Sequence, residues 1–178
     1  MLMCTASTLV VMALPRRPNL ADRLVLVDIT PQPHQAGVER VRKFMAAHLD
    51  GFGTLEEAAQ AVAAFNPAKR RSDPEGLRRH LRQGADGRWR WHWDPAILLE
   101  EGEKDPPPEE ASAAAASVTV PTLLIAGMAS DVVREEEVDE FLKVMPAARV
   151  VRLDGAGHMV VGDSNDAFVE AIRTFLSD

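Results

Sequence analysis

Cysteine is almost absent from this sequence of 178 residues, and its scarcity excludes several kinds of protein. Cys4 is the only cysteine, so the chain cannot form an internal disulfide bond. The cysteine and histidine residues do not have the spacing of zinc ligands, and we therefore expect a chain without a metal site. A composition of this kind is typical of a reducing compartment and favours the cytoplasm.

Positive charge is in the minority. The sequence holds 20 lysine and arginine residues against 27 aspartate and glutamate residues, which gives a formal net charge of -7. A net negative charge opposes general binding to the phosphate backbone of nucleic acids or to anionic membranes. We therefore expect neither nucleic acid nor membrane among the partners of this chain.

Apolar runs long enough to cross a bilayer are also lacking. The longest candidate, residues 1–14, is nearly uncharged but falls short of the roughly 20 residues that a spanning helix needs. Arg16 and Arg17 follow this run, whereas the basic residues of a secretory signal precede its apolar part. A buried helix is the expected structure of the segment.

What the chain does contain is enough apolar material for one ordinary domain, with 46% hydrophobic residues. Three compact apolar runs, at residues 23–28, 120–126 and 149–153, show no polar alternation. Such runs are typical of a parallel sheet that is covered by helices on both faces. Helical periodicity over 134–145 and after 163–166 supplies two of these helices, and the sequence predicts an α/β fold.

The long stretch between the first two apolar runs has a different character. Amphipathic helices are predicted at residues 38–49, 55–65 and 74–81, and the stretch is therefore expected to be an all-helical insertion. Residues 100–117, with three consecutive prolines and many alanines, have the composition of a linker.

Titratable side chains follow the second and third predicted strands. Asp131 and His158 lie on these two loops, and the carboxyl ends of parallel strands meet at one edge of a sheet. An aspartate on the imidazole Nδ1 would leave Nε2 to deprotonate a nucleophile. An alternative remains open for this loop, since Asp131 or Ser130 can also cap the following helix.

Together these motifs resemble those of the α/β-hydrolase family. Residues 121–127 with Ser130 and Asp131 resemble the seventh strand and acid loop of the family, and residues 155–159 resemble its histidine loop. Residues 16–28 resemble the end of the helix after the nucleophile, followed by the sixth strand. The resemblance covers nearly the whole chain.

The resemblance implies an organisation in three parts. Residues 1–33 and 118–178 correspond to the carboxyl-terminal part of the hydrolase core, and residues 34–117 correspond to the cap and its linker. The sequence has no Gly-x-Ser-x-Gly motif, on which the family carries its nucleophile. The family's spacing back from Pro18 puts Cys4 at that position, ahead of Ser7. His158 would then be the base, Asp131 the acid and Cys4 the nucleophile. Some relatives carry the acid on the loop after the sixth strand, which makes Asp28 the runner-up for this role, although a residue in this place is more often structural.

The three tryptophans of the chain, Trp89, Trp91 and Trp93, stand at alternate positions in the insertion. They are interpreted either as an aromatic wall of a substrate pocket or as anchors between cap and core. His34, His48 and His80 are not spaced as metal ligands, and they receive no role.

The function that the resemblance implies is hydrolysis of a small carboxylic ester, lactone or related acyl compound, without a cofactor. Relatives with the same triad also carry out perhydrolysis, carbon-carbon bond hydrolysis or epoxide opening, and the sequence does not choose among them. The alternative is a catalytically inactive, truncated remnant that acts as a binding protein. The first predicted strand would then present a free edge, open to a partner or to self-association.

Overall fold

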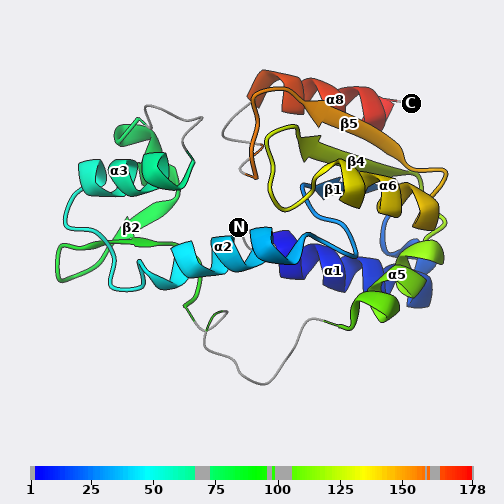
Figure 1. Ribbon diagram of the computed structural model, residues 1–178, viewed down its shortest axis with the longest axis horizontal. Helices are drawn as coiled ribbons and strands as arrows, with labels where there is room; N and C mark the ends of the chain where they lie inside the picture. Colours follow the sequence, from blue (N-terminus) through cyan, green and yellow to red (C-terminus); the bar gives the residue numbers. More distant parts are fainter. Residues whose placement is uncertain are drawn as a thin grey trace. The chain divides into compact units, whose positions relative to one another are not determined.

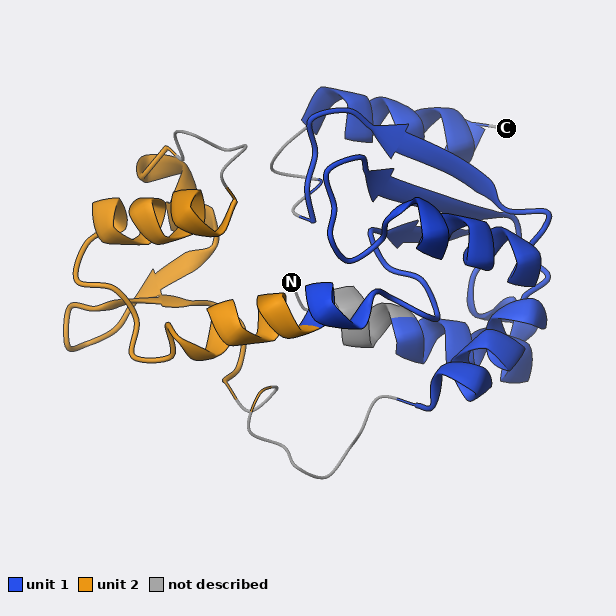
Figure 2. Cartoon of the chain, viewed as in Figure 1, with its two compact units in different colours: residues 1–38, 104–178 blue, residues 39–103 orange. Residues whose placement is uncertain are grey.

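The computed structural model describes residues 3–66, 73–95, 98, 106–158, 160 and 165–177, with side chains from residue 8 onward. It divides into two compact units, residues 1–38 together with 104–178, and residues 39–103 (Figure 2). The three-part division at residues 33 and 117 stays a prediction.

Unit 1 is built on a parallel sheet. Its strands are β1 (Leu24–Val27), β4 (Thr122–Gly127) and β5 (Arg149–Leu153), in the order β1-β4-β5. Every residue of the central strand β4 is buried, as expected for a strand with apolar side chains on both faces. The three predicted strands are confirmed, and their carboxyl ends lie at one edge of the sheet.

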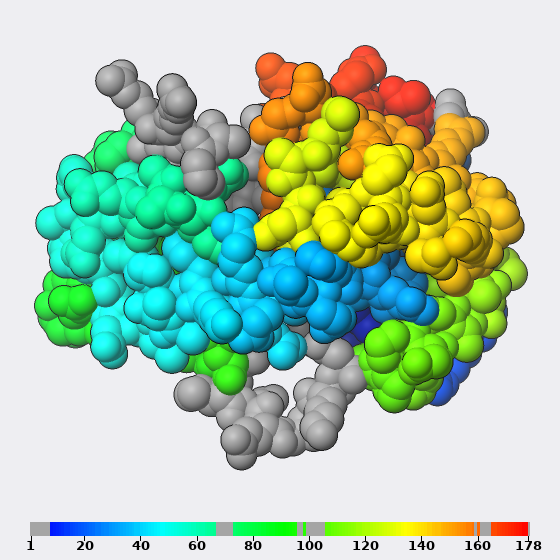
Figure 3. Space-filling view, in the orientation of Figure 1, coloured from blue at the N-terminus to red at the C-terminus, as the bar shows by residue number. Residues whose placement is uncertain are grey.

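Helices cover both faces of this sheet (Figure 1). On one face lies α8 (Asn165–Ser177), whose Phe175 is buried with Leu123, Ile125 and Leu153. On the other face lie α1 (Met3–Ala13) and α6 (Glu135–Val144). The outer side of α6 forms part of the surface of unit 1 (Figure 3). The predicted architecture, a parallel sheet with flanking helices, is confirmed.

The amino-terminal apolar run is helical, as predicted, and continues into two short 3-10 turns, η1 (Leu14–Arg16) and η2 (Pro18–Leu20). Val11 and Leu14 are buried, whereas Leu9 is 61% exposed. None of the helices in the described part of the chain has the length and apolar character that a membrane crossing requires.

The linker predicted at residues 100–117 needs correction. Its second half forms the helix α5 (Pro108–Ala116), which packs against α1 and buries Ala111 and Ala115. Alanine is the strongest helix former. Proline is well tolerated at the first helical position, because the backbone N–H that it lacks would have no partner within the helix. Residues 100–105 of this stretch lie outside the described residues.

The inserted region is not all-helical, contrary to the prediction. It contains α2 (Gln35–Ala46), which begins in unit 1, α3 (Leu55–Phe65) and the short 3-10 helix η3 (Glu75–Arg79). An antiparallel hairpin then pairs β2 (Leu81–Gln83) with β3 (Trp89–Trp91). Tryptophan favours strands, and Gly87 adopts a positive φ of 79° between the two strands, which turns the chain back.

Unit 2 has a hydrophobic core of its own. Its buried members are Phe52, Leu55, Ala58, Ala59, Val62, Leu77 and Leu81. Half-buried Trp89 and Trp91 pack against this core, and the rings of Trp91 and Phe52 meet edge to face with centroids 5.7 Å apart. Two of the three tryptophans are therefore part of the packing of the unit that carries them.

Candidate active site

Three loops converge at the carboxyl edge of the sheet in unit 1. They follow β1, β4 and β5, and Gly127, the last residue of β4, lies against both of the other loops. A Cβ atom at this position would lie 2.3 Å from the carbonyl oxygen of Ala156 and 2.5 Å from that of Gly157. Only glycine permits such an approach, so Gly127 brings the loop that carries His158 against the end of β4.

His158 pairs with Asp28 at this edge. The imidazole Nδ1 lies 2.7 Å from Oδ2 of the carboxylate, and the two side chains are 8% and 0% exposed. Because an ionised carboxylate only accepts hydrogen bonds, Nδ1 carries the proton of this contact. The imidazole is thereby held in the tautomer whose Nε2 can take a proton from a nucleophile.

The carboxylate of Asp28 is fixed on both of its oxygens. The backbone N–H of Gly127 donates to Oδ1 over 3.0 Å, and the hydroxyl of Ser130 donates to Oδ2 over 2.6 Å. Asp28 also has a positive φ of 50°, in the left-handed region that residues other than glycine seldom occupy. This backbone conformation directly follows β1 and is of the strained kind that gathers at functional sites.

The residue that pairs with His158 is therefore not Asp131, the first choice of the sequence analysis, and the catalytic role of either aspartate stays a prediction. The structure places Asp28, the alternative, on Nδ1 of His158. The physical reason is the left-handed turn at Asp28, since the side chain at the end of β1 reaches the end of the neighbouring strand β4. The presence of an aspartate in a sequence does not reveal whether its backbone is left-handed, so this pairing could not be read from the residue type.

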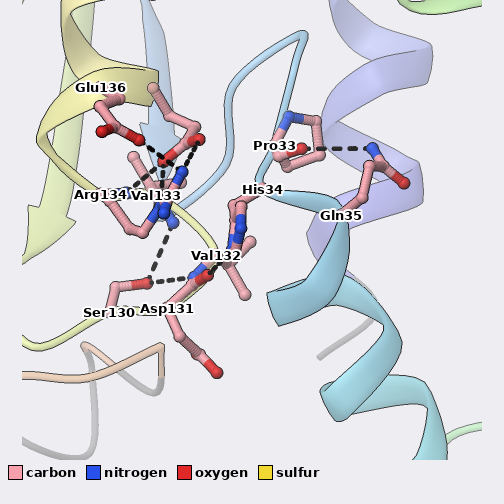
Figure 4. Close-up of polar contacts among 10 residues, drawn as sticks. Pro33, His34, Gln35, Ser130, Asp131, Val132, Val133, Arg134 and Glu136 are labelled. Carbon is pink, nitrogen blue, oxygen red and sulfur yellow. Dashed lines mark hydrogen bonds and ion pairs between the residues drawn. The ribbon is translucent and has the colours of Figure 1, made fainter.

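Asp131 is part of a contact between two loops of unit 1. Its carbonyl oxygen lies 3.0 Å from Nδ1 of His34, and the backbone N–H of His34 donates to the carbonyl oxygen of Val132 over 2.9 Å (Figure 4). The start of α2 also approaches closely, because a Cβ atom at Gly37 would lie 2.0 Å from the same carbonyl oxygen of Asp131. The sequence analysis gave His34 no role and missed this contact.

Neither Ser130 nor Asp131 caps the following helix. Helix α6 begins at Glu135, with Arg134 as its N-cap residue. The carboxylate of Glu137 accepts from the backbone N–H of Arg134 over 3.0 Å, and the Arg134 guanidinium donates to the same carboxylate. This contact with Arg134 holds the pKa of Glu137 below its ordinary value of 4.5.

The remaining predicted site residues lie in α1 and in unit 2. Cys4 and Ser7 lie in α1, but their side chains are outside the described part of the chain. Trp89 and Trp91 contribute to the core of unit 2, and Trp93 is half-buried. The nucleophile role of Cys4 and the substrate contact of the three tryptophans stay predictions. Among the described residues, no three histidine, cysteine or acidic side chains gather in a way that could hold a metal ion.

Comparisons with known proteins find hydrolases. The family model described as TAP-like protein, one of the α/β-hydrolase models, matches residues 91–178. Esterase YbfF of Escherichia coli is 30% identical over 162 residues, which cover 88% of this chain and 58% of the esterase. The sn-1-specific diacylglycerol lipase ABHD11 of Mus musculus is 27% identical over 168 residues, which cover 91% of this chain and 53% of the lipase.

A solved structure shares the fold. The crystal structure of E-2-(acetamidomethylene)succinate hydrolase superimposes with a TM-score of 0.78 at 20% sequence identity. The match covers 98% of this chain and 65% of that chain. The present chain thus spans a little more than half the length of the curated relatives it matches.

Proposed function

This chain belongs to the α/β-hydrolase family, and from that premise we propose that it hydrolyses a small carboxylic ester, lactone or related acyl compound. The observation that carries the proposal is the buried hydrogen bond between Asp28 and Nδ1 of His158. The two curated relatives described above are named as an esterase and a diacylglycerol lipase, which supports an acyl substrate over an epoxide or a carbon-carbon bond.

In the proposed mechanism His158 acts first as a base and then as an acid. Its Nε2 removes the proton of the nucleophile, which attacks the acyl carbon, and the imidazolium gives that proton to the departing alkoxide. Water then attacks the acyl-enzyme, its proton passes to Nε2, and the nucleophile recovers a proton when the acid product leaves. Asp28 holds the tautomer and stabilises the imidazolium in both halves of the reaction.

The nucleophile in this proposal is Cys4, on the family spacing described above. A thiol next to a histidine base is easily converted to the reactive thiolate. A Cys4→Ala variant should therefore lose hydrolysis without losing the pairing of Asp28 with His158. Retained activity in this variant would remove Cys4 from the mechanism and leave the base and acid in place.

The decisive experiment compares two aspartates in the hydrolysis of a chromogenic short-chain ester. Asp28→Asn should lower kcat by roughly a thousandfold or more, because an amide in this place favours the wrong imidazole tautomer. Asparagine tolerates the left-handed backbone of this position, so the variant should fold. Asp131→Asn is the matched control, and it should keep most of the activity.

Three outcomes would contradict the proposal. The first is the absence of hydrolysis by the unmodified chain, and the second is hydrolysis that survives His158→Ala. The third is a loss in Asp131→Asn as large as that in Asp28→Asn, which would return the acid role to Asp131.

A further inference from the structure

Ser130 makes contacts that the proposed mechanism does not yet use. Its side chain is buried, with 7% exposure, in the loop that follows β4. The hydroxyl oxygen accepts from the backbone N–H of Val132 over 3.1 Å and from that of Val133 over 3.2 Å (Figure 4). The same hydroxyl lies 2.6 Å from Oδ2 of Asp28.

These contacts fix the direction of the hydroxyl proton. A serine hydroxyl can donate one hydrogen bond and accept two. Because Val132 and Val133 occupy both acceptor sites, the proton of Ser130 is left to point at Asp28. The two backbone N–H groups also polarise the hydroxyl and strengthen the bond that it donates.

The acceptor of this proton is the oxygen that His158 uses. Oδ2 of Asp28 receives both the Ser130 hydroxyl and Nδ1 of His158, while Oδ1 receives the backbone N–H of Gly127. Rotation of the carboxylate about its Cβ–Cγ bond would break contacts on both oxygens. With the Ser130 hydroxyl removed, the contacts that remain among the described residues are those of the Gly127 backbone N–H with Oδ1 and of His158 itself with Oδ2.

We propose that Ser130 is a positioning residue of the hydrolase site, whose hydroxyl holds Oδ2 of Asp28 in place for Nδ1 of His158. This inference rests on the proposed function, because it takes the pairing of Asp28 with His158 as the working base and acid. The competing explanation is a purely local role, in which Ser130 only shapes the turn before α6 through Val132 and Val133.

The test is the exchange rate of the Nδ1 proton of His158 with water, measured by NMR on the full chain. Threonine and valine have the same shape, so Ser130→Thr and Ser130→Val differ only in the hydroxyl. Ser130→Val should speed the exchange by about tenfold relative to Ser130→Thr, the factor that corresponds to one lost hydrogen bond to a charged group. In the ester assay kcat should fall by a similar factor in Ser130→Val, with KM unchanged.

Two controls assign the NMR signal to His158 and test whether the effect is specific to Ser130. His158→Gln assigns the Nδ1 resonance, since His34 and His48 also carry hydrogen-bonded Nδ1 atoms. Ser117→Ala removes a serine hydroxyl that donates to the carbonyl oxygen of Ala113, away from the active-site loops, and it should leave the exchange rate unchanged.

The outcomes separate this inference from the proposed function. Equal exchange rates in Ser130→Thr and Ser130→Val, with the signal lost in Asp28→Asn, would overturn the role of Ser130 and leave the proposed function standing. A signal that persists unchanged in Asp28→Asn would overturn the pairing itself, and both proposals with it. A tenfold difference between the two Ser130 variants, together with loss in Asp28→Asn, supports both.

Discussion

At the scale of single residues, Gly127 determines how closely the active-site loops can approach. Its backbone N–H holds Asp28, and its missing side chain leaves room for the carbonyl oxygens of Ala156 and Gly157. The backbone N–H groups of Met128 and Ala129 continue the contact by donating to Leu153 and Ala156. One residue without a side chain thus joins the loop that carries Asp28 to the loop that carries His158.

Gly127→Ala should therefore damage both stability and the site. The added methyl group must displace backbone carbonyl oxygens rather than a flexible side chain, so we expect a loss of about 1–3 kcal/mol in the free energy of unfolding. Urea denaturation measures this loss, and the Nδ1 proton of His158 should exchange faster with water.

Gly53→Ala is the matched control, because its added methyl group would meet only the flexible carboxylate of Glu57, at 3.2 Å. A Gly127→Ala variant as stable as this control would contradict the packing that the structure shows.

Much of the candidate site was visible in the sequence at this scale, but the pairing was not. His158 stands out because small residues precede it after an apolar strand, which is a local pattern. The choice between Asp28 and Asp131 depends on a left-handed backbone at Asp28 and on the neighbouring position of β1 and β4. Both properties arise only in the folded chain, and the spacing of residues along the sequence does not reveal them.

At the scale of secondary-structure elements, burial on both faces made the strands easy to predict. β4 is buried throughout because helices cover both of its sides, and β5 has the bounds that the sequence indicated. The elements that were missed are short or mixed in composition. The hairpin of β2 and β3 has only three residues in each strand, and the alanines of α5 follow a proline run that is typical of linkers.

Helix α6 depends on a capping contact that titrates with acid. The pKa of Glu137 is lowered, chiefly by its hydrogen bonds to the Arg134 side chain, so its stabilising effect is fully present above the ordinary value of 4.5. The effect is lost as the pH falls below that value through the lower pKa of the folded state. Glu137→Gln should cost about 1 kcal/mol at neutral pH and flatten the dependence of unfolding on acid in this range.

Glu136→Gln provides the comparison for this prediction. Glu136 also pairs with Arg134, but its side chain is 77% exposed, whereas that of Glu137 is 11% exposed. Exposed pairs contribute little, so Glu136→Gln should change stability by less than about 0.5 kcal/mol. Thermal unfolding of both variants between pH 3 and pH 7 (about the range in which carboxylates titrate) measures the difference. Equal acid sensitivity in the two variants would argue against the capping role.

At the scale of the whole molecule, the residues proposed as base, acid and positioning group all belong to unit 1. In its described part, the sheet of this unit ends at β1 on one side. The backbone N–H of Leu24 donates to Pro121, just before β4, and that of Asp28 donates to Ile125 in β4. The alternating geometry of a strand therefore directs the N–H groups of Val25 and Val27 away from β4. A strand edge of this kind can pair with a second copy of the chain.

We therefore predict that self-association rises with concentration and involves β1. Val25→Pro removes an N–H group that points away from β4, so it should weaken self-association by about tenfold or more without breaking the sheet. Val25→Ala shortens the side chain but keeps the N–H group, and it should associate like the unmodified chain. Sedimentation velocity over a range of concentrations gives the comparison. A chain that stays monomeric throughout, or two variants that associate equally, would rule out this edge as the contact.

The left-handed backbone and full burial of Asp28 have a consequence for directed evolution. Its buried carboxylate is stabilised only as long as Gly127, Ser130 and His158 donate to it, and glycine tolerates the backbone conformation better. Selection for thermal tolerance would thus favour replacing Asp28 together with the polar side chains that contact it, whereas selection for turnover would, on the proposed function, retain the whole group. Libraries built on this scaffold have to vary these positions together and screen for both traits.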